Sequence, residues 1–450
     1  MFVSVFDCLT KIDAFFWSYL GFSLIALLGF YLTFKSGFFQ FRAIPSVLRT
    51  FWHFIQHKSC AGQGTHPLKV FCTSVGGMIG VGNIAGIVTA LQIGGPGALF
   101  WVWIAAILGS LIKYSEVFLG LKYRVPNEKG GYDGGSIHFL KKAFNGRWIG
   151  MIACVLLCIY AAEVYQFSVL THNISLNWQI DHIWVVLAFL GLILYTVLGG
   201  IKRVGKICSL LMPFFTLLYI VMGFYVIAHH LPELPSLFVF VFQSAFTGQA
   251  EMGGFAGGAI LLAMQQGISR AVYSADIGIG YDSIIQSETS AAQIENQARL
   301  SMLGVFIDNL VCTCTLLIAL TSGYWNAVPR LDPALVVQKA LAAYFPGQEV
   351  FMPIFLFVLV YTTLISYLFV GFKCARFLHQ RHGEKVYLAF AVFFLLFFSF
   401  FDQSKALLAM SLAGCLLLCI NLLGILRLRH EISFSLFDKS QAAKDPLIEK

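Results

Sequence analysis

The stretch GGMIGVGNIAG, residues 76–86, decides the fold of this chain of 450 residues. It places five glycines in eleven residues inside a long apolar segment. Because each glycine in a helix interior costs about 1 kcal/mol relative to alanine, an unbroken helix is not expected there. A second stretch, GQAEMGGFAGG at residues 248–258, again has five glycines in eleven. The two stretches predict two interrupted helices, and close packing of helices through small residues is the competing explanation.

Around these stretches, apolar segments alternate with polar loops. Hydrophobic residues make up 58% of the chain and charged residues only 12%, about half the charged share of a soluble protein. Segments of about 20 apolar residues span a bilayer, and lipid requires each of them to be a helix. Eleven are expected, near residues 15–32, 70–91, 97–121, 149–170, 183–198, 207–228, 237–264, 300–320, 350–372, 386–401 and 406–426. The predicted fold class is an all-α polytopic membrane protein.

The basic residues predict how the chain is oriented. Of the 30 Lys and Arg residues, 25 fall in loops on one side of the eleven segments. The positive-inside rule therefore predicts an external N-terminus and a cytoplasmic C-terminus, in a plasma membrane such as the bacterial inner membrane. The net charge of +8 is explained by the basic loops that orient the chain in the membrane, so no nucleic-acid partner is expected.

The two glycine-rich stretches occupy matching places, because each lies in the first helix of a set of five. An odd number of crossings means that the second set enters the membrane from the opposite side, the inverted repeat of secondary transporters. Free N–H groups at an interrupted helix can hold a carboxylate, and free carbonyls can coordinate Na⁺. The predicted divisions are an N-terminal additional helix, a basic connector, two repeats and a tail, at residues 1–36, 37–69, 70–230, 231–428 and 429–450.

Ionisable residues within membrane segments are functional candidates because their insertion is costly. Lys113 and Glu116 are three residues apart on one expected helix, so they are predicted to neutralise each other. Asp308 could help to bind a cation or could accept hydrogen bonds from a neighbouring helix. Glu163 and Gln166 are also three apart and share a helix face, where Gln166 offers donor and acceptor groups to a zwitterion.

Two adjacent threonines, Thr362 and Thr363, lie in the middle of the third segment of the second set. Each hydroxyl could bond back to its own helix. Alternatively, both could complete a Na⁺ shell begun by carbonyls of the first interrupted helix, since hard cations prefer oxygen ligands. Tyr367 lies one turn further and could wall the same pocket, and Phe255 is the matching aromatic residue in the second interruption.

Several longer motifs resemble those of the sodium:alanine symporter family, the alanine or glycine:cation symporters. They are GVGNIAG (80–86), GGPGALFWVW (94–103), KYSEVFLGLKYR (113–124), GGIKRVGK (199–206), FTGQAEMGGFAGGA (246–259) and FIDNLVCTCT (306–315). The resemblance is close over residues 67–374. It implies a leucine-transporter-like fold with one additional N-terminal helix, and Na⁺-coupled uptake of a small neutral amino acid, alanine or glycine. No cofactor is implied beyond Na⁺ as coupling ion, and no obligatory protein partner is evident.

The resemblance also implies which residues form the site. Those expected at the substrate are Gly76, Gly77, Val81, Gly82, Asn83, Gln166, Phe255, Gly257, Gly258, Thr363 and Tyr367. Those expected at the cation are Gly76, Ile79, Thr362 and Thr363.

The chain departs from the family near this expected site. Val81 stands where relatives often carry threonine, Glu163 where asparagine is common, and Tyr367 where tryptophan is usual. The stretch SADIGIG at 274–280 replaces a Ser-Asn-Glu-Ala-Gly-Leu-Gly pattern. A carboxyl group at Glu163 could couple transport to protons or select a substrate with an additional amine.

Three functional classes are compared on these grounds. A Na⁺/amino-acid symporter working by alternating access leads, and a proton-coupled symporter with Glu163 as proton carrier is the alternative. An intramembrane enzyme is disfavoured because His138, His172 and His182 lie near segment ends or in loops, and no His-Glu-x-x-His or Gly-x-Ser-x-Gly motif occurs. A channel is also disfavoured, since the sequence contains no charge ring or pore-loop signature.

Overall fold

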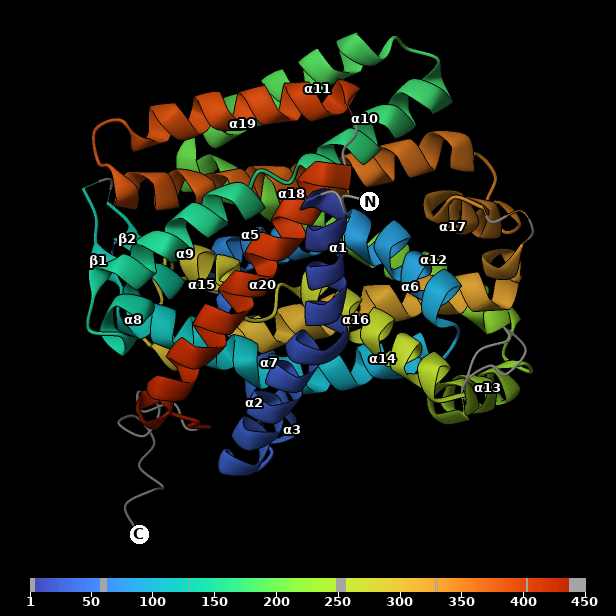
Figure 1. The fold of residues 1–450 in the computed structure, drawn as a ribbon, viewed down its shortest axis with the longest axis horizontal. Coiled ribbons are helices and arrows are strands. Elements are labelled where there is room, and N and C mark those ends of the chain that lie inside the picture. Colours follow the sequence, from blue (N-terminus) through green and yellow to red (C-terminus); the bar gives the residue numbers. More distant parts are fainter. Residues whose placement is uncertain are drawn as a thin grey trace.

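Helices make up nearly all of the secondary structure in the computed structural model, which describes residues 5–56, 63–128, 130–247, 256–327, 329, 331–401 and 404–436 (Figure 1). The α-helices are α1 Val5–Phe15, α2 Phe22–Lys35, α3 Phe39–Arg42, α4 Ile44–Gln56, α5 Pro67–Met78, α6 Ile87–Gly94, α7 Ala98–Lys122, α8 Ser136–Ala143, α9 Arg147–Tyr160, α10 Val164–Trp178, α11 His182–Val197, α12 Gly200–His229, α13 Leu234–Thr247, α14 Ala256–Ala275, α15 Tyr281–Gln286, α16 Ile294–Ser322, α17 Pro333–Ala342, α18 Gln348–Leu378, α19 Gly383–Phe400 and α20 Ser404–Arg427. Shorter elements are the π-helices η1 Phe16–Gly21 and η2 Gly82–Gly86, the 3-10 helices η4 Tyr324–Asn326 and η5 Arg429–Glu431, and the paired strands β1 Val125–Pro126 and β2 Tyr132–Asp133.

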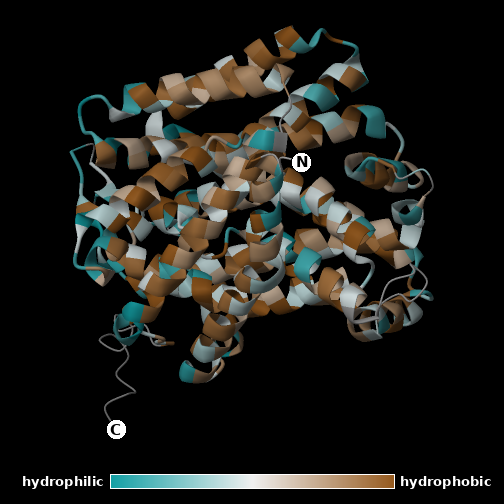
Figure 2. Ribbon diagram, viewed as in Figure 1, coloured by the Kyte–Doolittle hydropathy of each residue, from teal (hydrophilic) through white to brown (hydrophobic). Residues whose placement is uncertain are grey.

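Eight helical stretches are long and apolar enough to cross a membrane. They are Val5–Lys35, Ala98–Lys122, Arg147–Trp178, Gly200–His229, Ile294–Ser322, Gln348–Leu378, Gly383–Phe400 and Lys405–Arg427. The bent pair Pro67–Met78 and Gly82–Gly94 adds a ninth. Figure 2 shows that these ribbons are predominantly hydrophobic, with hydrophilic residues in the connecting loops. The predicted class, an all-helical polytopic membrane protein, is confirmed. Of the two further crossings expected from the sequence, the one at residues 183–198 coincides with the shorter apolar helix α11, and the one at residues 237–264 does not coincide with a single helix.

The helices α14 and α15 follow one another along the length of α7. Gly267 packs against Ala98 at the start of α7, and Ile277 packs against Gly109 near its middle. Beyond the break, Ser283 of α15 lies close to Gly120 near the end of α7. Since α7 is long enough to span a bilayer, α14 and α15 together form one interrupted crossing, and the interruption falls at residues 276–280.

This placement corrects the crossing expected at residues 237–264. Ala245 of α13 lies against Gly97, next to the point where α14 meets α7, so α13 and α14 come together at one end of α7 and are not two halves of one crossing. Most of the glycine-rich stretch at 248–258 lies outside the described residues, at 248–255, so the interruption expected there stays a prediction. The interruption seen in the described residues uses Gly278 and Gly280, whose φ angles of 74° and 106° favour glycine.

The two interrupted crossings run antiparallel to each other. The Tyr281 hydroxyl of α15 donates a hydrogen bond of 3.2 Å to the Thr73 carbonyl of α5. At the other end, Gly94 of α6 packs closely against Gln266 of α14. The break at residues 79–81 therefore lies beside the break at residues 276–280. This is the arrangement that an inverted repeat produces, with half-helix ends from both repeats meeting inside the bundle.

The N-terminal helices α1 and α2, with η1 between them, pack on α7 and α20. Gly29 of α2 closely approaches Leu108 of α7, and the Trp17 indole N–H donates to the Ser411 hydroxyl at 3.0 Å. The opposite face is exposed and apolar, with Leu27 71% accessible. Such a face is stable in contact with lipid chains, which is consistent with a membrane helix added to a ten-helix core.

The contact between Gly77 and Tyr281 makes the pairing of α5 with α15 sensitive to one methyl group. A Cβ at position 77 would collide with the Tyr281 hydroxyl, and packed interiors accommodate such insertions at about 1–3 kcal/mol. We expect Gly77→Ala to lower the midpoint of thermal unfolding of the detergent-solubilised protein. Gly191→Ala is the control, because no atom lies near its added Cβ. A Gly77→Ala protein as stable as the Gly191→Ala protein would contradict this packing.

Charged groups surround the Lys373 ammonium at the end of the bundle that carries the β1–β2 ribbon. It lies 2.8 Å from Glu288 Oε1 and 3.4 Å from Asp133 Oδ1. Burial raises the pKa of Asp133, but Lys373 and a hydrogen bond from Asn127 outweigh burial and lower it below its usual value. Because the folded-state pKa is depressed, ionised Asp133 stabilises the fold above its unfolded pKa of about 4.

That stabilisation is lost as pH falls through the lowered pKa of Asp133. We therefore compare unfolding temperatures between about pH 6 and about pH 3, the range in which carboxyl groups titrate. Over this range the unfolding temperature of the wild-type protein is expected to fall more steeply than that of the Asp133→Asn variant. Thermal unfolding in detergent across this range measures the difference. If the unfolding temperatures of the two proteins changed in parallel with pH, the ion pair between Asp133 and Lys373 would not contribute to stability.

Candidate functional site

The first break is an extended residue between two helices. Helix α5 ends at Met78, and Ile79 has φ −83° and ψ 106°, a conformation that stops the helical hydrogen-bond ladder. The chain resumes as the π-turn η2 and then α6, bent by 49° from α5. Gly80 allows the break to approach a neighbouring helix, because a Cβ there would collide with the Gln166 side-chain oxygen. The expected interruption at residues 76–86 is therefore present.

Gln166 connects this break to a third interruption, which the sequence did not predict. Helix α9 ends at Tyr160 and α10 begins at Val164, and Glu163 between them has a left-handed φ of 47°. The Gln166 amide donates to Glu163 Oε2 at 2.9 Å, and its oxygen accepts from the Val81 backbone N–H at 3.1 Å. The expected proximity of Glu163 and Gln166 is observed, and both side chains are buried.

Asn83 and Asp308 form further hydrogen bonds at the first break. The Gly80 N–H donates to Asn83 Oδ1 at 3.0 Å, and the Asn83 amide donates to Asp308 Oδ1 at 2.5 Å. The second Asp308 oxygen accepts from the Ser274 hydroxyl at 2.9 Å. Of the two interpretations of Asp308, the structure supports an acceptor for neighbouring helices, which ties the last turn of α14 to the first break.

Oxygen atoms from α5 and α18 converge beside Thr363. Its hydroxyl lies 3.1 Å from the Gly76 carbonyl, 3.2 Å from the Ile79 carbonyl and 3.0 Å from the Leu359 carbonyl. One hydroxyl proton can satisfy one of these three acceptors at a time. A hard cation prefers such an all-oxygen environment, so the chemistry of this cluster fits Na⁺.

Thr362 contributes to the same region less directly. Its hydroxyl lies 2.9 Å from the Leu359 carbonyl and 3.2 Å from Met212 Sδ, while its Cβ faces Gly76. The back-bond to its own helix is therefore present, and the Leu359 carbonyl adjoins both threonine hydroxyls. Sequence reasoning missed Leu359 because a backbone carbonyl has no signature in its side chain.

Tyrosine rings surround the second break. The Tyr367 hydroxyl donates to Asp276 Oδ1 at 3.1 Å, and its ring stacks on Tyr281 with centroids 4.1 Å apart. Tyr160 lies 5.8 Å from Tyr367 and 6.3 Å from Tyr273, between ring centroids. Tyr367 is thus directed at the second break, one turn beyond the threonine pair that faces the first.

The expected pairing of Lys113 with Glu116 is wrong. The Lys113 ammonium lies 3.5 Å from Asp276 Oδ2 and 3.6 Å from Asp282 Oδ2, and donates to the Asp276 carbonyl at 2.7 Å. The Glu116 carboxyl oxygens are buried without a hydrogen-bond partner among the described residues. Spacing along one helix could not reveal that the second break brings two other carboxyl groups to Lys113, so its role is to hold that break.

The remaining expected residues are only partly brought together. Gly82 packs near Tyr273 and Ser274. Gly257 and Gly258 lie in the first turn of α14, more than fourteen residues or roughly 20 Å of helix before those neighbours, so the structure does not bring them to the first break. Phe255 lies outside the described residues.

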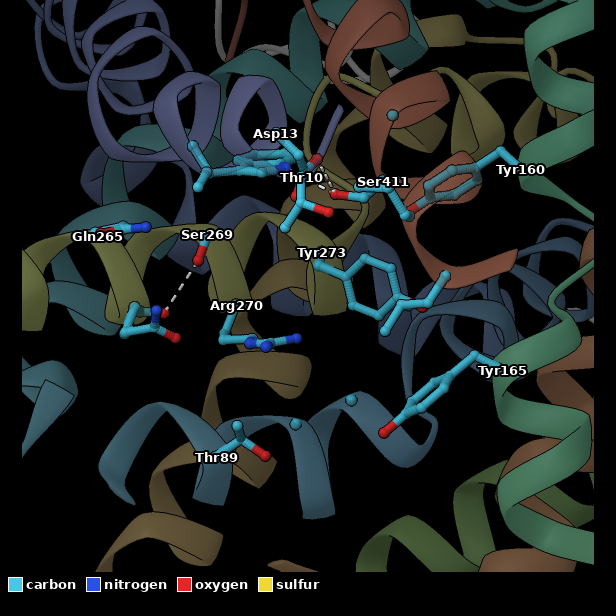
Figure 3. A pocket seen from close by; sticks show the side chains of 18 of the residues that line it. Thr10, Asp13, Thr89, Tyr160, Tyr165, Gln265, Ser269, Arg270, Tyr273 and Ser411 are labelled. Atoms are coloured by element: carbon cyan, nitrogen blue, oxygen red, sulfur yellow. Dashed lines mark hydrogen bonds between the residues drawn. The ribbon is translucent and has the colours of Figure 1, made fainter. Parts of the chain in front are cut away.

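A cavity of about 610 Å³ opens onto the first break (Figure 3). Its walls come from α1, η2, α6, α14 and α20, and from Tyr160 and Tyr165 on either side of the third interruption. Polar side chains on these walls include Thr10, Asp13, Thr89, Gln266, Arg270 and Ser411. Arg270 follows the crossing expected at residues 237–264, but it lies within α14 and lines the cavity. The sequence did not predict that the helix continues beyond Met264, because polar residues are frequent between positions 265 and 276.

Comparison with known proteins identifies the family. The model of the sodium:alanine symporter family matches residues 3–446. The protein named sodium/alanine symporter AgcS from Methanococcus maripaludis is 29% identical, with 84% of each chain covered. The probable sodium/glutamine symporter GlnT from Bacillus subtilis is also 29% identical, covering 96% of this chain and 91% of that protein.

Solved structures show the same fold at low identity. A manganese transporter from Eremococcus coleocola matches with a TM-score of 0.52 at 12% identity, over 78% of this chain and 75% of that one. MhsT in complex with L-phenylalanine matches with a TM-score of 0.51 at 14% identity, over 80% of this chain and 82% of that one. These matches confirm the leucine-transporter-like fold. By its family match over nearly the whole length, the chain belongs to the sodium:alanine symporter family and is a cation-coupled amino-acid symporter in a membrane.

Proposed function

We propose that this protein couples the uptake of a small neutral amino acid, such as alanine or glycine, to the entry of Na⁺. The observation that carries this proposal is the convergence of the Gly76, Ile79 and Leu359 carbonyls on the Thr363 hydroxyl. An ion there would join α5 of the first repeat to α18 of the second. Since the two repeats move relative to each other during alternating access, such an ion would favour one of the two conformations.

The amino acid is assigned to the space bordered by the two breaks, Gln166 and the tyrosine rings. The family pattern also puts Val81, Gly82, Asn83 and Tyr367 at the substrate, which supports this assignment because the first three lie at the first break and Tyr367 bonds to Asp276 at the second. Because close-packed residues surround this space, larger side chains would clash with its walls. The names of the two relatives, a sodium/alanine and a probable sodium/glutamine symporter, support a neutral amino acid as substrate.

Uptake into proteoliposomes tests this function. With the purified protein reconstituted, an imposed inward Na⁺ gradient is expected to accumulate labelled alanine or glycine above the equilibrium level. Leucine serves as the larger control and should accumulate less. Absence of accumulation of every amino acid tested under the Na⁺ gradient would refute the proposal.

A proton-coupled mechanism is the second candidate, and the environment of Glu163 favours it. This carboxyl group is buried and bonds to Gln166, which the family pattern puts at the substrate. Within the described residues no ammonium or guanidinium group forms an ion pair with it. A lone buried carboxyl group can take up a proton instead of remaining charged.

The two candidates make opposite predictions for Glu163→Gln. If Na⁺ drives uptake, this variant keeps Na⁺-driven accumulation, because glutamine can still bond to Gln166. If protons drive it, accumulation under an inward pH gradient without Na⁺ occurs in the wild-type protein and is lost in the variant. Uptake measured under the two gradients separately, in both proteins, decides between them.

We further propose that the N-terminus is external and the C-terminus cytoplasmic, from the asymmetry of the basic residues. In this orientation the cavity lies on the external side of the breaks, and α15 and the β1–β2 ribbon lie on the cytoplasmic side. Single cysteines placed at either terminus in a cysteine-free background would report the orientation. Labelling of the C-terminal cysteine in intact cells by a membrane-impermeant reagent would contradict it.

A further inference from the structure

Arg270 is a charged side chain that the transport mechanism described so far leaves unused. It lies on α14, one turn before Tyr273, and lines the cavity that opens onto the first break (Figure 3). An arginine within a membrane-crossing helix is costly and is retained where it faces water or a ligand. Its position between the cavity and the break makes it a candidate for binding the substrate.

The guanidinium group of Arg270 has no hydrogen-bond or ion-pair partner in the described part of the protein, although its charge acts on Asp13 across the cavity. Its Nε atom is buried and forms no hydrogen bond, and no ion pair with a carboxylate is present. The carboxylate of Asp13, on the opposite wall, is engaged by the Ser411 hydroxyl at 2.6 Å. Figure 3 shows Arg270 between these α1 and α20 residues and Thr89 of α6, with its side chain in the cavity.

The donors at the first break, by contrast, are already in use. The Val81 N–H is bonded to Gln166, and the Gly80 N–H is bonded to Asn83. A carboxylate arriving there would have to displace both side-chain oxygens. The planar fork of a guanidinium group, with its donors free, binds a carboxylate through two parallel hydrogen bonds without displacing a protein group.

We propose that the cavity contains a carboxylate-binding subsite in which Arg270 holds the α-carboxylate of the amino acid. This inference rests on the proposed function for the identity of the ligand. The cavity volume of about 610 Å³ accommodates a small zwitterion together with water. Gly82 and Tyr273 line the cavity at the break, so an amino acid bound by Arg270 already adjoins the transport site.

Chemical labelling of the purified full-length protein tests the subsite without any transport measurement. Phenylglyoxal modifies accessible arginines, and mass spectrometry of the peptide containing Arg270 reports its modification. In the presence of Na⁺, alanine is expected to protect Arg270, whereas alaninamide, which lacks the carboxylate, should not. Arg49 on α4, which is exposed, is the internal control and should be modified equally under all conditions.

Uptake kinetics of two variants provide the second readout. Arg270→Gln is expected to raise KM for alanine by about tenfold or more, the effect of losing a charge-assisted hydrogen bond. Arg270→Lys keeps the charge without the fork and should lie between that variant and the wild-type protein. Measured at saturating alanine, the dependence on Na⁺ concentration should be unchanged, because Arg270 does not contact the oxygen cluster at Thr363.

The outcomes separate the subsite from the proposed function. Equal protection by alanine and alaninamide, no protection by alanine, or an unchanged KM in Arg270→Gln would overturn the subsite. Failure of the wild-type protein to accumulate any amino acid would overturn the proposed function. Protection by alanine alone would still support a carboxylate at Arg270 in that case.

Discussion

Replacing Thr363 with valine will raise the Na⁺ concentration for half-maximal amino-acid uptake by about tenfold or more. The valine side chain has nearly the same shape but no hydroxyl oxygen, so the cluster formed with the Gly76, Ile79 and Leu359 carbonyls loses one ligand. Interactions of this kind with a charged group contribute about 1.5–3 kcal/mol, which corresponds to roughly 10- to 150-fold in affinity. Uptake by proteoliposomes at a series of Na⁺ concentrations measures the effect.

Thr313→Val is the matched control for this substitution. Thr313 is also a membrane-helix threonine that bonds to its own helix, at the Asn309 carbonyl, and it accepts a hydrogen bond from Trp103. It does not take part in the oxygen cluster, so its loss should leave the Na⁺ dependence unchanged. Equal Na⁺ dependence of Thr363→Val and the wild-type protein would place the coupling ion elsewhere.

Replacing Lys113 with methionine will destabilise the protein by about 3–5 kcal/mol, the cost of leaving a buried ion-pair partner uncompensated. Lys113 is completely buried with Asp276 and Asp282, and it also binds the Ala275 and Asp276 carbonyls at the second break. Its removal leaves two buried carboxyl groups facing each other without a cation. The yield of folded protein and its unfolding temperature in detergent should both fall.

Second substitutions identify the partners of Lys113. Replacing Asp276 and Asp282 with asparagine in the Lys113→Met background removes the uncompensated charges and should restore part of the stability. Glu116→Gln in the same background should restore much less, because Glu116 does not pair with Lys113. Greater rescue by Glu116→Gln would reinstate the pairing expected from spacing along the helix and contradict the observed one.

The sequence predicted the membrane fold well because lipid imposes a simple rule on the backbone. Long apolar segments must form helices there, and glycine-rich interruptions can be recognised against that background. The first break was located correctly, since its glycines coincide with the place where α5 ends. The break at residues 276–280 was not predicted, because the glycines near 248–258 outnumber Gly278 and Gly280, although positive φ angles occur at the latter pair.

The candidate site was predictable where side chains carry the chemistry and where partners are close in sequence. Glu163 and Gln166 were matched correctly in this way. Contacts between distant segments were not predictable. Several features depend on which helices pack together. They are the position of the Leu359 carbonyl, the hydrogen bond between Asp308 and Asn83, the ion pairs of Lys113 and the position of Arg270. Arg270 in particular required the true end of α14, at Ala275, to be known.

In the proposed mechanism, the ion beside Thr363 and the amino acid at the two breaks stabilise each other. Equilibrium binding to the purified protein tests this most directly, by measuring the Kd of alanine across Na⁺ concentrations and the Kd of Na⁺ with and without alanine. Saturating Na⁺ is predicted to tighten alanine binding by about 5- to 150-fold, and saturating alanine must tighten Na⁺ binding by the same factor. Alanine binding that is unchanged by Na⁺ would contradict the account.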